Sequence, residues 1–398
     1  MKIEKLDNYG RGICYVDNKI TFVDNALPDE EVEINITKQN KKYNEAIVTK
    51  YIKESNNRIK PLCPYYEKCG GCNLLNTSYE ETIKFKKEKL ESIVSKYAGI
   101  ESNIEIIKSD NNLSYRNKIT LKIINKQYGY YISNSHKLIN IDNCLLAEQP
   151  IKDFIKDIKH LNIKNGELII RSNYNNELLI VINTKDKINI DIDYLKDNHK
   201  IVGIIINDKL VNGDNKYIDI INDKMFQISY DSFFQINRNI CSKLFNLIND
   251  NVNDNEIILD LYCGVGTLGL NAKKAKKIYG IEIIPNAIIN CITNAKINKQ
   301  DNTYYMVGDT SKCITKINDN IDTIIVDPPR AGLDNITRET IINLKPNKII
   351  YVSCDPMTFA RDIKILKEHY NIIDIKGLDM FPYTHHVECV SVLCRKAL

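Results

Sequence analysis

The sequence predicts an α/β protein in three parts: a small N-terminal β-barrel over residues 1–56, a mixed, β-rich central domain over 57–225, and a C-terminal Rossmann-like domain over 226–398. Short runs of alternating apolar and polar residues indicate the barrel. Strands that alternate with helices from about residue 226 indicate a mostly parallel sheet in the C-terminal part. With 398 residues, 43% of them hydrophobic, the chain is long enough to form two or three cores.

The N-terminal part contains three alternating runs, at 20–23, 31–36 and 43–48. Turn residues stand at 8–10 and at 26–29. This pattern is typical of a small barrel of the OB type.

The central part opens with a helix and continues with strands. Residues 78–97 are rich in Lys and Glu, and their apolar positions have helical spacing. From 113 to about 225 the sequence is strand-like again, as at 119–123, 168–171 and 178–181. We therefore expect a β-rich domain after the helix.

Composition narrows the class of protein. No stretch approaches the roughly 20 apolar residues of a membrane span, and Met1–Lys5 lack an apolar signal region. We therefore expect a cytoplasmic protein. We also expect a monomer, because nothing in the sequence demands a dimer. The 12 cysteines are then expected to be reduced, metal-bound or catalytic. A net charge of +4 permits an RNA partner without arguing for one.

A nucleotide cofactor is predicted by the first strand and turn of the C-terminal domain. The apolar run 256–261 precedes a turn that contains Gly264 and Gly266, which let the backbone approach a ligand closely. Glu282 ends the next strand, 22 residues past Asp260, where a Rossmann-type site holds ribose hydroxyls. The turn lacks the third glycine of the dinucleotide fingerprint. NAD(P) and S-adenosylmethionine both remain open on these residues alone.

Two further strand ends carry reactive groups. Asp327-Pro328-Pro329-Arg330 follows the apolar run 324–326, and Cys354 follows the run 348–352. Open α/β sheets bind ligands at the carboxyl ends of their strands. The sequence therefore predicts a thiol nucleophile at the mouth of the cofactor pocket, the alternative being a buried packing cysteine.

A second cysteine group lies in the central part. Cys63, Cys69 and Cys72 stand on a glycine-containing loop and can turn towards one metal centre, which requires a fourth ligand. Tetrahedral zinc and a [4Fe-4S] cluster are both compatible with this spacing.

Taken together, the motifs resemble the RNA uracil-C5 methyltransferase family. The resemblance rests on five segments: Phe233 to Asn237, Asp260 to Thr267, Asp327 to Gly332, Ser353 to Asp362 and His385 to Val390. The first 55 residues resemble the TRAM domain, a small RNA-binding barrel. The resemblance implies a class I methyltransferase domain with a mostly parallel sheet of seven strands. It also implies S-adenosylmethionine as methyl donor and uridine in structured RNA as acceptor.

The resemblance also assigns site residues. It implies Cys354 as nucleophile, Glu388 as general base, and His385 and His386 as loop residues that shape the pocket. It adds Cys144 as the fourth ligand and selects [4Fe-4S] over zinc. With the glycine turn, the expected cofactor-binding residues are Gln235, Tyr262, Gly264, Thr267, Glu282 and Asp327.

The implied chemistry explains these residue types. Addition of the Cys354 thiolate to C6 of uracil makes C5 nucleophilic, so that C5 can attack the sulfonium methyl group. Glu388 then removes the C5 proton before the thiolate leaves by β-elimination. The uridine must leave its stack for this reaction, so a flipped base is expected.

The RNA partner is the least determined feature. Two groups of basic and aromatic residues suit contact with phosphates and stacking on bases: Lys38, Lys41, Lys42 and Tyr43 on the barrel, and the segment 115–118 in the central part. The alternative is that these residues form a solvated face without a partner. The resemblance favours 23S rRNA, with tRNA as the alternative substrate. Methylation of another base and a non-catalytic iron-sulfur protein that binds RNA or senses redox state are rival hypotheses.

Overall fold

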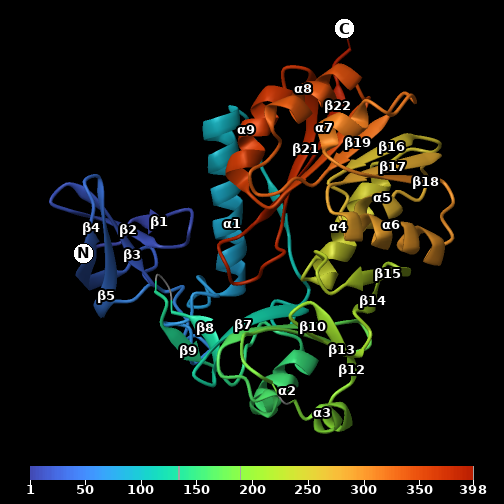
Figure 1. The fold of residues 1–398 in the computed structure, drawn as a ribbon. Helices are drawn as coiled ribbons and strands as arrows, with labels where there is room; N and C mark the ends of the chain where they lie inside the picture. Colours follow the sequence, from blue (N-terminus) through green and yellow to red (C-terminus); the bar gives the residue numbers. More distant parts are fainter. Residues whose placement is uncertain (133–134, 189, 398) are drawn as a thin grey trace.

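The computed structural model describes residues 1–132, 135–188 and 190–397 and confirms the α/β class (Figure 1). The N-terminal part is a five-stranded sheet in the order β1-β2-β3-β5-β4. A bridge between Lys2 and Glu31 joins its two edges, so the sheet closes into a barrel around a small core that includes Ile3, Val23 and Val32. Its strands are β1 (Lys5–Leu6), β2 (Gly12–Val16), β3 (Lys19–Asp24), β4 (Glu31–Gln39) and β5 (Tyr43–Lys53).

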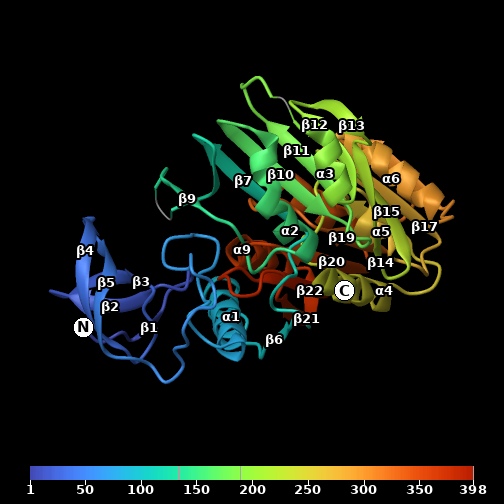
Figure 2. The same cartoon turned by 90° about the horizontal axis from the view of Figure 1, so that it is seen from below.

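The central part contains a seven-stranded sheet in the order β13-β12-β11-β10-β7-β8-β9. Alternate residues of β11 enter different cores: Ile180 packs with α2, whereas Leu179 and Val181 face the C-terminal core. Figure 2 shows α2 and α3 on the same side of this sheet. The elements are β7 (Lys118–Ile124), β8 (Gln127–Tyr131), β9 (Leu138–Asn140), α2 (Gln149–Asp157), the 3-10 turn η2 (Ile158–Leu161), β10 (Gly166–Ser172), β11 (Leu178–Asn183), α3 (Ile192–Asn198), β12 (Ile201–Ile206) and β13 (Lys209–Gly213).

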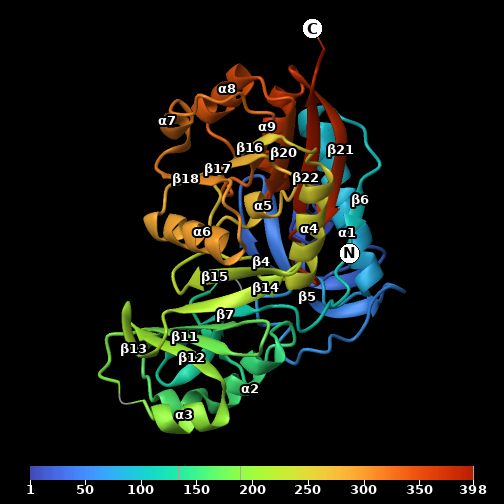
Figure 3. The same cartoon turned by 90° about the vertical axis from the view of Figure 1, so that its right-hand side faces the viewer.

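A hairpin of β14 (Lys216–Ile221) and β15 (Lys224–Ser229) lies between the central sheet and the C-terminal domain (Figure 3). It is bonded to helix α6 (Pro285–Ile297), because Asn294 Oδ1 accepts from Gln227 N at 2.6 Å and Asn294 Nδ2 donates to Gln227 O at 3.2 Å. The hairpin therefore joins the two parts.

The C-terminal sheet has eight strands in the order β18-β17-β16-β19-β20-β22-β21-β6. Its first five strands run parallel, and β22 lies antiparallel to both β20 and β21. The seven predicted strands are present, and β6 extends the sheet beyond them. Their bounds are β6 (Glu105–Ile107), β16 (Ile257–Leu261), β17 (Lys277–Glu282), β18 (Thr303–Val307), β19 (Thr323–Val326), β20 (Lys348–Ser353), β21 (Tyr370–Leu378) and β22 (Glu388–Arg395).

Helices cover both faces of this sheet. In β20, Tyr351 packs with α1, α8 and α9, whereas Val352 packs with α4 and α5 on the opposite face. The helices are α1 (Tyr79–Ile93), which continues as the π-turn η1 (Val94–Ala98), α4 (Arg238–Asp250), α5 (Thr267–Leu270), α7 (Thr310–Ile314), α8 (Asn335–Leu344) and α9 (Pro356–Leu366).

Helix α1 begins where the sequence predicted a helix. Ser78 caps it by accepting from Glu81 N at 3.3 Å, and Gly99 ends η1 with a left-handed φ of +64°. Although α1 and β6 lie within 57–225, they pack against the C-terminal sheet (Figure 1). The domain boundaries at 56 and 225 stay predictions. No helix among the described residues has the length and apolarity that a membrane span requires.

Candidate active site

Four of the predicted site residues lie at one edge of the C-terminal sheet. Leu261 of β16 is paired with Ile281 of β17 and Val326 of β19, so that Tyr262, Glu282 and Asp327 follow these strands at neighbouring levels. Cys354 follows β20, which pairs with β19. The carboxyl ends of the parallel strands therefore bring these four side chains together, as the sequence predicted.

The turn after β16 is built around left-handed backbone. Tyr262, Gly264 and Gly266 have φ angles of +61°, +56° and +85°. For Tyr262 this conformation is uncommon, and such strain concentrates at binding sites. A Cβ added at Gly264 would meet no atom within 4 Å, whereas one at Gly266 would meet Tyr305 and Cys291. Gly264 thus borders open space that suits a bound cofactor.

The Glu282 carboxylate is held at this turn. Its Oε2 accepts from Gly264 N at 3.1 Å and its Oε1 from Ile284 N at 3.0 Å. Two acceptor lone pairs remain on a rigidly placed carboxylate, which fits the ribose hydroxyls of S-adenosylmethionine. Ile283 and Ile284 beside it are 63% and 51% exposed, and so offer an apolar surface that sequence reasoning missed.

Gln235 and Thr267 complete the predicted cofactor set. Thr267 opens α5 directly after the glycine turn. Gln235 is 7% exposed in the link between β15 and α4, and its carbonyl accepts from Asn117 Nδ2 at 3.0 Å. The neighbouring Asn237 caps α4 and donates from Nδ2 to Met380 O at 3.4 Å, so it ties this link to the segment before Glu388.

Cys354 and Glu388 lie next to the last residue pair of two neighbouring strands. In the antiparallel pair of β20 and β22, Ser353 is the partner of Cys389, and the pairing ends there. Cys354 follows Ser353, Glu388 is the first residue of β22, and the Glu388 carboxyl group is near enough to raise the pKa of Cys354. The sequence predicted both residues but not that strand pairing would bring them near each other.

Burial and the repulsion between like charges control the protonation of Glu388, Asp327 and Cys354. Burial, followed by the nearby Asp327, raises the pKa of Glu388 to about 8. Burial alone raises the pKa of Asp327 to about 6. The pKa of Cys354 rises to about 11, through burial first and then through Glu388 and Asp327, while Arg330 opposes the increase. Closely spaced acids of raised pKa are typical of catalytic sites.

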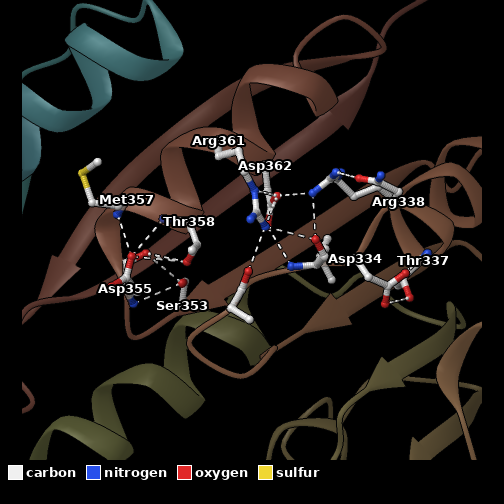
Figure 4. Close-up of polar contacts among 12 residues, drawn as sticks. Asp334, Thr337, Arg338, Ser353, Asp355, Met357, Thr358, Arg361 and Asp362 are labelled. Carbon is white, nitrogen blue, oxygen red and sulfur yellow. Dashed lines mark hydrogen bonds and ion pairs between the residues drawn. The ribbon is translucent and has the colours of Figure 1, made fainter.

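Helix α9 begins at Pro356, two residues after Cys354, and Figure 4 shows its capping residue Asp355 beside Ser353. Asp355 caps it by accepting from Met357 N and Thr358 N, both at 2.9 Å, and Ser353 Oγ accepts from Asp355 N at 3.3 Å. The amino-terminal end of a helix stabilises a thiolate. The position of Cys354 before α9 therefore offsets part of the repulsion between its thiolate and the Glu388 and Asp327 carboxylates.

Asp362 on α9 fixes the loop that follows Asp327 (Figure 4). Its buried carboxylate accepts from Leu333 N at 2.8 Å and Arg338 Nη1 at 2.6 Å, and also from Tyr351 and Arg361. A Cβ on Gly332 would lie 2.6 Å from Asp362 Oδ2, so this loop requires glycine there. Asp362 belongs to one of the motifs that carry the family resemblance, but its anchoring role was not predicted.

The four predicted ligand cysteines line one cavity of about 50 Å³. Tyr65 ties the two segments that contribute them, since its hydroxyl donates to Asp142 Oδ1 at 2.6 Å. Arg116 lines the same cavity, and its buried Nε has no hydrogen-bond partner among the described residues. A cationic donor without a partner suits an anionic centre of four thiolates.

The thiols are gathered but not yet arranged as ligands. Burial raises the pKa of Cys63, Cys69 and Cys72, which favours their neutral form. Within residues 1–132, 135–188 and 190–397, no three His, Cys, Asp or Glu side chains stand in a metal-holding arrangement. The residue types fit a metal centre, and binding would require the thiols to lose protons and draw together.

One predicted RNA-contacting segment is interior. Tyr115 and Asn117 are only 4% and 3% exposed, and Arg116 points to the cysteine cavity. The expectation that residues 115–118 contact RNA was wrong for Tyr115 and Asn117, whose side chains are buried and bond to Pro382 O and Gln235 O. Lys38, Lys41 and Lys42 on the barrel are exposed, as expected for a surface that meets RNA.

Comparisons with known proteins agree with this geometry. The family model for tRNA (uracil-5-)-methyltransferase matches residues 183–396, and the model for the TRAM domain matches residues 1–49. An uncharacterized RNA methyltransferase of Clostridium tetani is 34% identical, over 96% of this chain and 93% of that protein. One from Bacillus cereus is 32% identical, over 98% of this chain and 95% of that protein.

A solved structure has the same fold throughout. The Pyrococcus abyssi tRNA (uracil-54, C5)-methyltransferase, in complex with S-adenosyl-L-homocysteine, superposes with a TM-score of 0.82. It is 27% identical, and the match covers 99% of each chain. The similarity includes the barrel, the central part and the C-terminal sheet.

Proposed function

The chain belongs to the tRNA (uracil-5-)-methyltransferase family, and from this membership we propose that it methylates C5 of a uridine in 23S rRNA with S-adenosylmethionine as donor. The observation that supports the proposal is the last pair of β20 and β22, Ser353 with Cys389: Cys354 and Glu388 are the residues next to it, at the side of the sheet where Gly264 borders open space. A nucleophile and a base next to a cofactor turn are what C5 methylation needs.

Each residue has a defined task in this proposal. S-adenosylmethionine, when bound, supplies an electrophilic methyl group. The Cys354 thiol loses its proton to solvent and its sulfur forms a bond to C6 of the flipped uracil, and the electron pair displaced from the C5–C6 double bond allows C5 to take the methyl group. Glu388 accepts the C5 proton, the double bond forms again, and the bond from Cys354 to C6 breaks.

The raised pKa values are consistent with these tasks. The Cys354 thiol is mostly protonated in the free protein, because burial and two carboxyl groups oppose its ionisation. This limits wasteful reactions of a thiolate when no RNA is present. Glu388, with a pKa of about 8, is a stronger base than an ordinary glutamate once it is ionised.

The choice between RNA classes rests on two different supports. The combination of a TRAM-like barrel with the cysteine group favours 23S rRNA, as the sequence resemblance implied. The Pyrococcus abyssi neighbour acts on tRNA at uracil 54, which favours tRNA as the second candidate.

We further propose that Cys63, Cys69, Cys72 and Cys144 hold a [4Fe-4S] cluster rather than zinc. Their common cavity and the buried Arg116 Nε support a centre of negative charge. Iron and sulfide content of anaerobically purified protein, with and without a Cys72→Ser substitution, tests this. Stoichiometric zinc, or metal content unaffected by the substitution, would reject the cluster.

The decisive experiment supplies labelled S-adenosylmethionine with separate pools of unmodified 23S rRNA and tRNA, followed by nucleoside analysis. Label in 5-methyluridine from 23S rRNA is expected, and label from the tRNA pool alone would move the proposal to tRNA. A Cys354→Ala variant should lose turnover yet retain S-adenosylmethionine binding, whereas Cys394→Ala on β22 should remain active. Full activity of Cys354→Ala would overturn the mechanism.

A further inference from the structure

The segment 379–387 joins β21 to β22 and ends directly before Glu388. Its backbone carbonyls are held by donors from outside the C-terminal third of the chain. Phe381 O accepts from Lys86 Nζ at 2.9 Å, and His385 O accepts from Lys89 Nζ at 2.8 Å. The position of this segment, and with it the start of β22, therefore depends on helix α1.

Lys86 makes a second contact that anchors the beginning of the same segment. Its ammonium group pairs with Asp379, and the side chains of both residues are 0% exposed. Asp379 Oδ2 also accepts from Tyr79 OH at 2.6 Å. A buried lysine is costly unless its donors are satisfied, and here a carboxylate and a carbonyl of one short segment satisfy them.

The cysteine-rich loop holds the other end of the segment. Asn73, the residue after Cys72, donates from its backbone N to Tyr383 O at 3.2 Å, and Leu74 N donates to the same oxygen at 3.1 Å. The Asn73 side chain reaches further, since Oδ1 lies 2.8 Å from His385 Nδ1. The loop of the proposed metal ligands is thus bonded to the chain three residues before Glu388.

We propose that Lys86 and Asn73 are positioning residues, which fix the segment 379–387 so that the Glu388 carboxylate faces C5 of the target uracil. The cysteine centre acts on the reaction through Asn73, as the rigid support of this segment and without electron transfer. The inference rests on the proposed uridine C5 methylation. It gives α1 and the cysteine loop a role in the last step, removal of the C5 proton.

This role has a specific kinetic consequence. If Glu388 is displaced, Cys354 can still bond to C6 and the methyl group can still reach C5. The proton on C5 then has no acceptor, so the bond from Cys354 to C6 persists. The methylated protein–RNA adduct should accumulate, which a general loss of folding or of RNA binding would not produce.

The test compares Lys86→Met and Asn73→Ala with Lys87→Met, a matched control on the same helix. The Lys87 side chain is 40% exposed; it donates a hydrogen bond to Asn103 and pairs with Glu91. With the RNA that the wild-type protein methylates, we expect both positioning variants to lower kcat by about tenfold, part of the effect of a general base. The adduct resistant to SDS should rise, and S-adenosylmethionine affinity should not change.

Other results separate the inference from the proposed function. Lower turnover without adduct, or unchanged turnover in both variants, would overturn the positioning role. Absence of 5-methyluridine with wild-type protein would instead overturn the proposed function. Metal content of Asn73→Ala equal to that of the wild type would show that the effect does not come from loss of the centre. If Lys86→Met does not fold, Tyr79→Phe, which removes one hydrogen bond to Asp379, replaces it with the same expectations.

Discussion

Replacement of Gly264 by alanine tests whether the open space beside this residue belongs to the cofactor, because it should weaken S-adenosylmethionine binding more than it weakens the fold. At a φ of +56° an alanine adds about 1 kcal/mol of backbone strain. No atom lies within 4 Å of the added Cβ, so the fold itself meets no clash. We expect the free energy of unfolding to fall by about 1 kcal/mol only. The new methyl group occupies the space where the backbone would approach S-adenosylmethionine, and the Kd should rise by about tenfold or more, equivalent to about 1.4 kcal/mol.

Gly266→Ala is the matched control, two residues along the same turn. Its φ of +85° implies similar strain, but its Cβ would lie 3.2 Å from Tyr305 Oη and 3.3 Å from Cys291 Sγ. Overpacking raises the expected stability loss to about 2–3 kcal/mol. Urea unfolding and calorimetric titration with S-adenosylmethionine measure both quantities. Wild-type affinity in Gly264→Ala, or a stability loss as large as that of Gly266→Ala, would refute the assignment of this space to the cofactor.

Three further outcomes are expected from the active site. Glu388→Gln keeps the shape but cannot accept a proton, so turnover should fall about 10²–10⁴-fold while the methylated adduct persists on gels; an adduct that resolves at the wild-type rate would contradict this role. Since burial and Asp327 raise the pKa of Glu388 to about 8, the ionised base increases with pH, and kcat, which includes removal of the C5 proton, should rise from pH 6 to 9; a flat kcat profile over this range would count against it. Asp362→Asn leaves the 10%-exposed Arg338 without its ion-pair partner and should lower the urea unfolding free energy by about 3 kcal/mol, and a loss under 1 kcal/mol would contradict the anchoring role.

Much of the cofactor edge could be predicted from sequence, because parallel strands end at one side of a sheet. Local patterns located β16, β17, β19 and β20; Glu282 ends β17, and Tyr262, Asp327 and Cys354 follow the other three strands. The cysteine group was foreseen through its spacing and the family resemblance, and the structure gathers its four members at one cavity. Its metal and its ligand geometry stay predictions.

The contacts that hold the active site could not be predicted in this way. Lys86 and Asp379 are 293 residues apart in the chain, and each looks like an ordinary charged surface residue in its local context. Helical periodicity indicated α1 but not the sheet that it covers. Tyr115 and Arg116 showed the same difficulty, because aromatic and basic residues beside each other fit both an RNA surface and an interior network.

The path of the chain explains why distant segments meet at Glu388. After the barrel and the cysteine loop, α1 and β6 pack into the C-terminal sheet before the central sheet begins. The chain returns to the C-terminal sheet with α4, which packs on one face, and adds its next strand at β16. The central domain is therefore an insertion between β6 and the rest of the sheet. The cysteine loop precedes α1 directly, so the helix that supports the C-terminal sheet also carries this loop to the segment 379–387. Asn73 and Lys86 both contact the segment 379–387. An RNA that binds the barrel and the central domain would therefore bind close to the contacts that we propose to position Glu388.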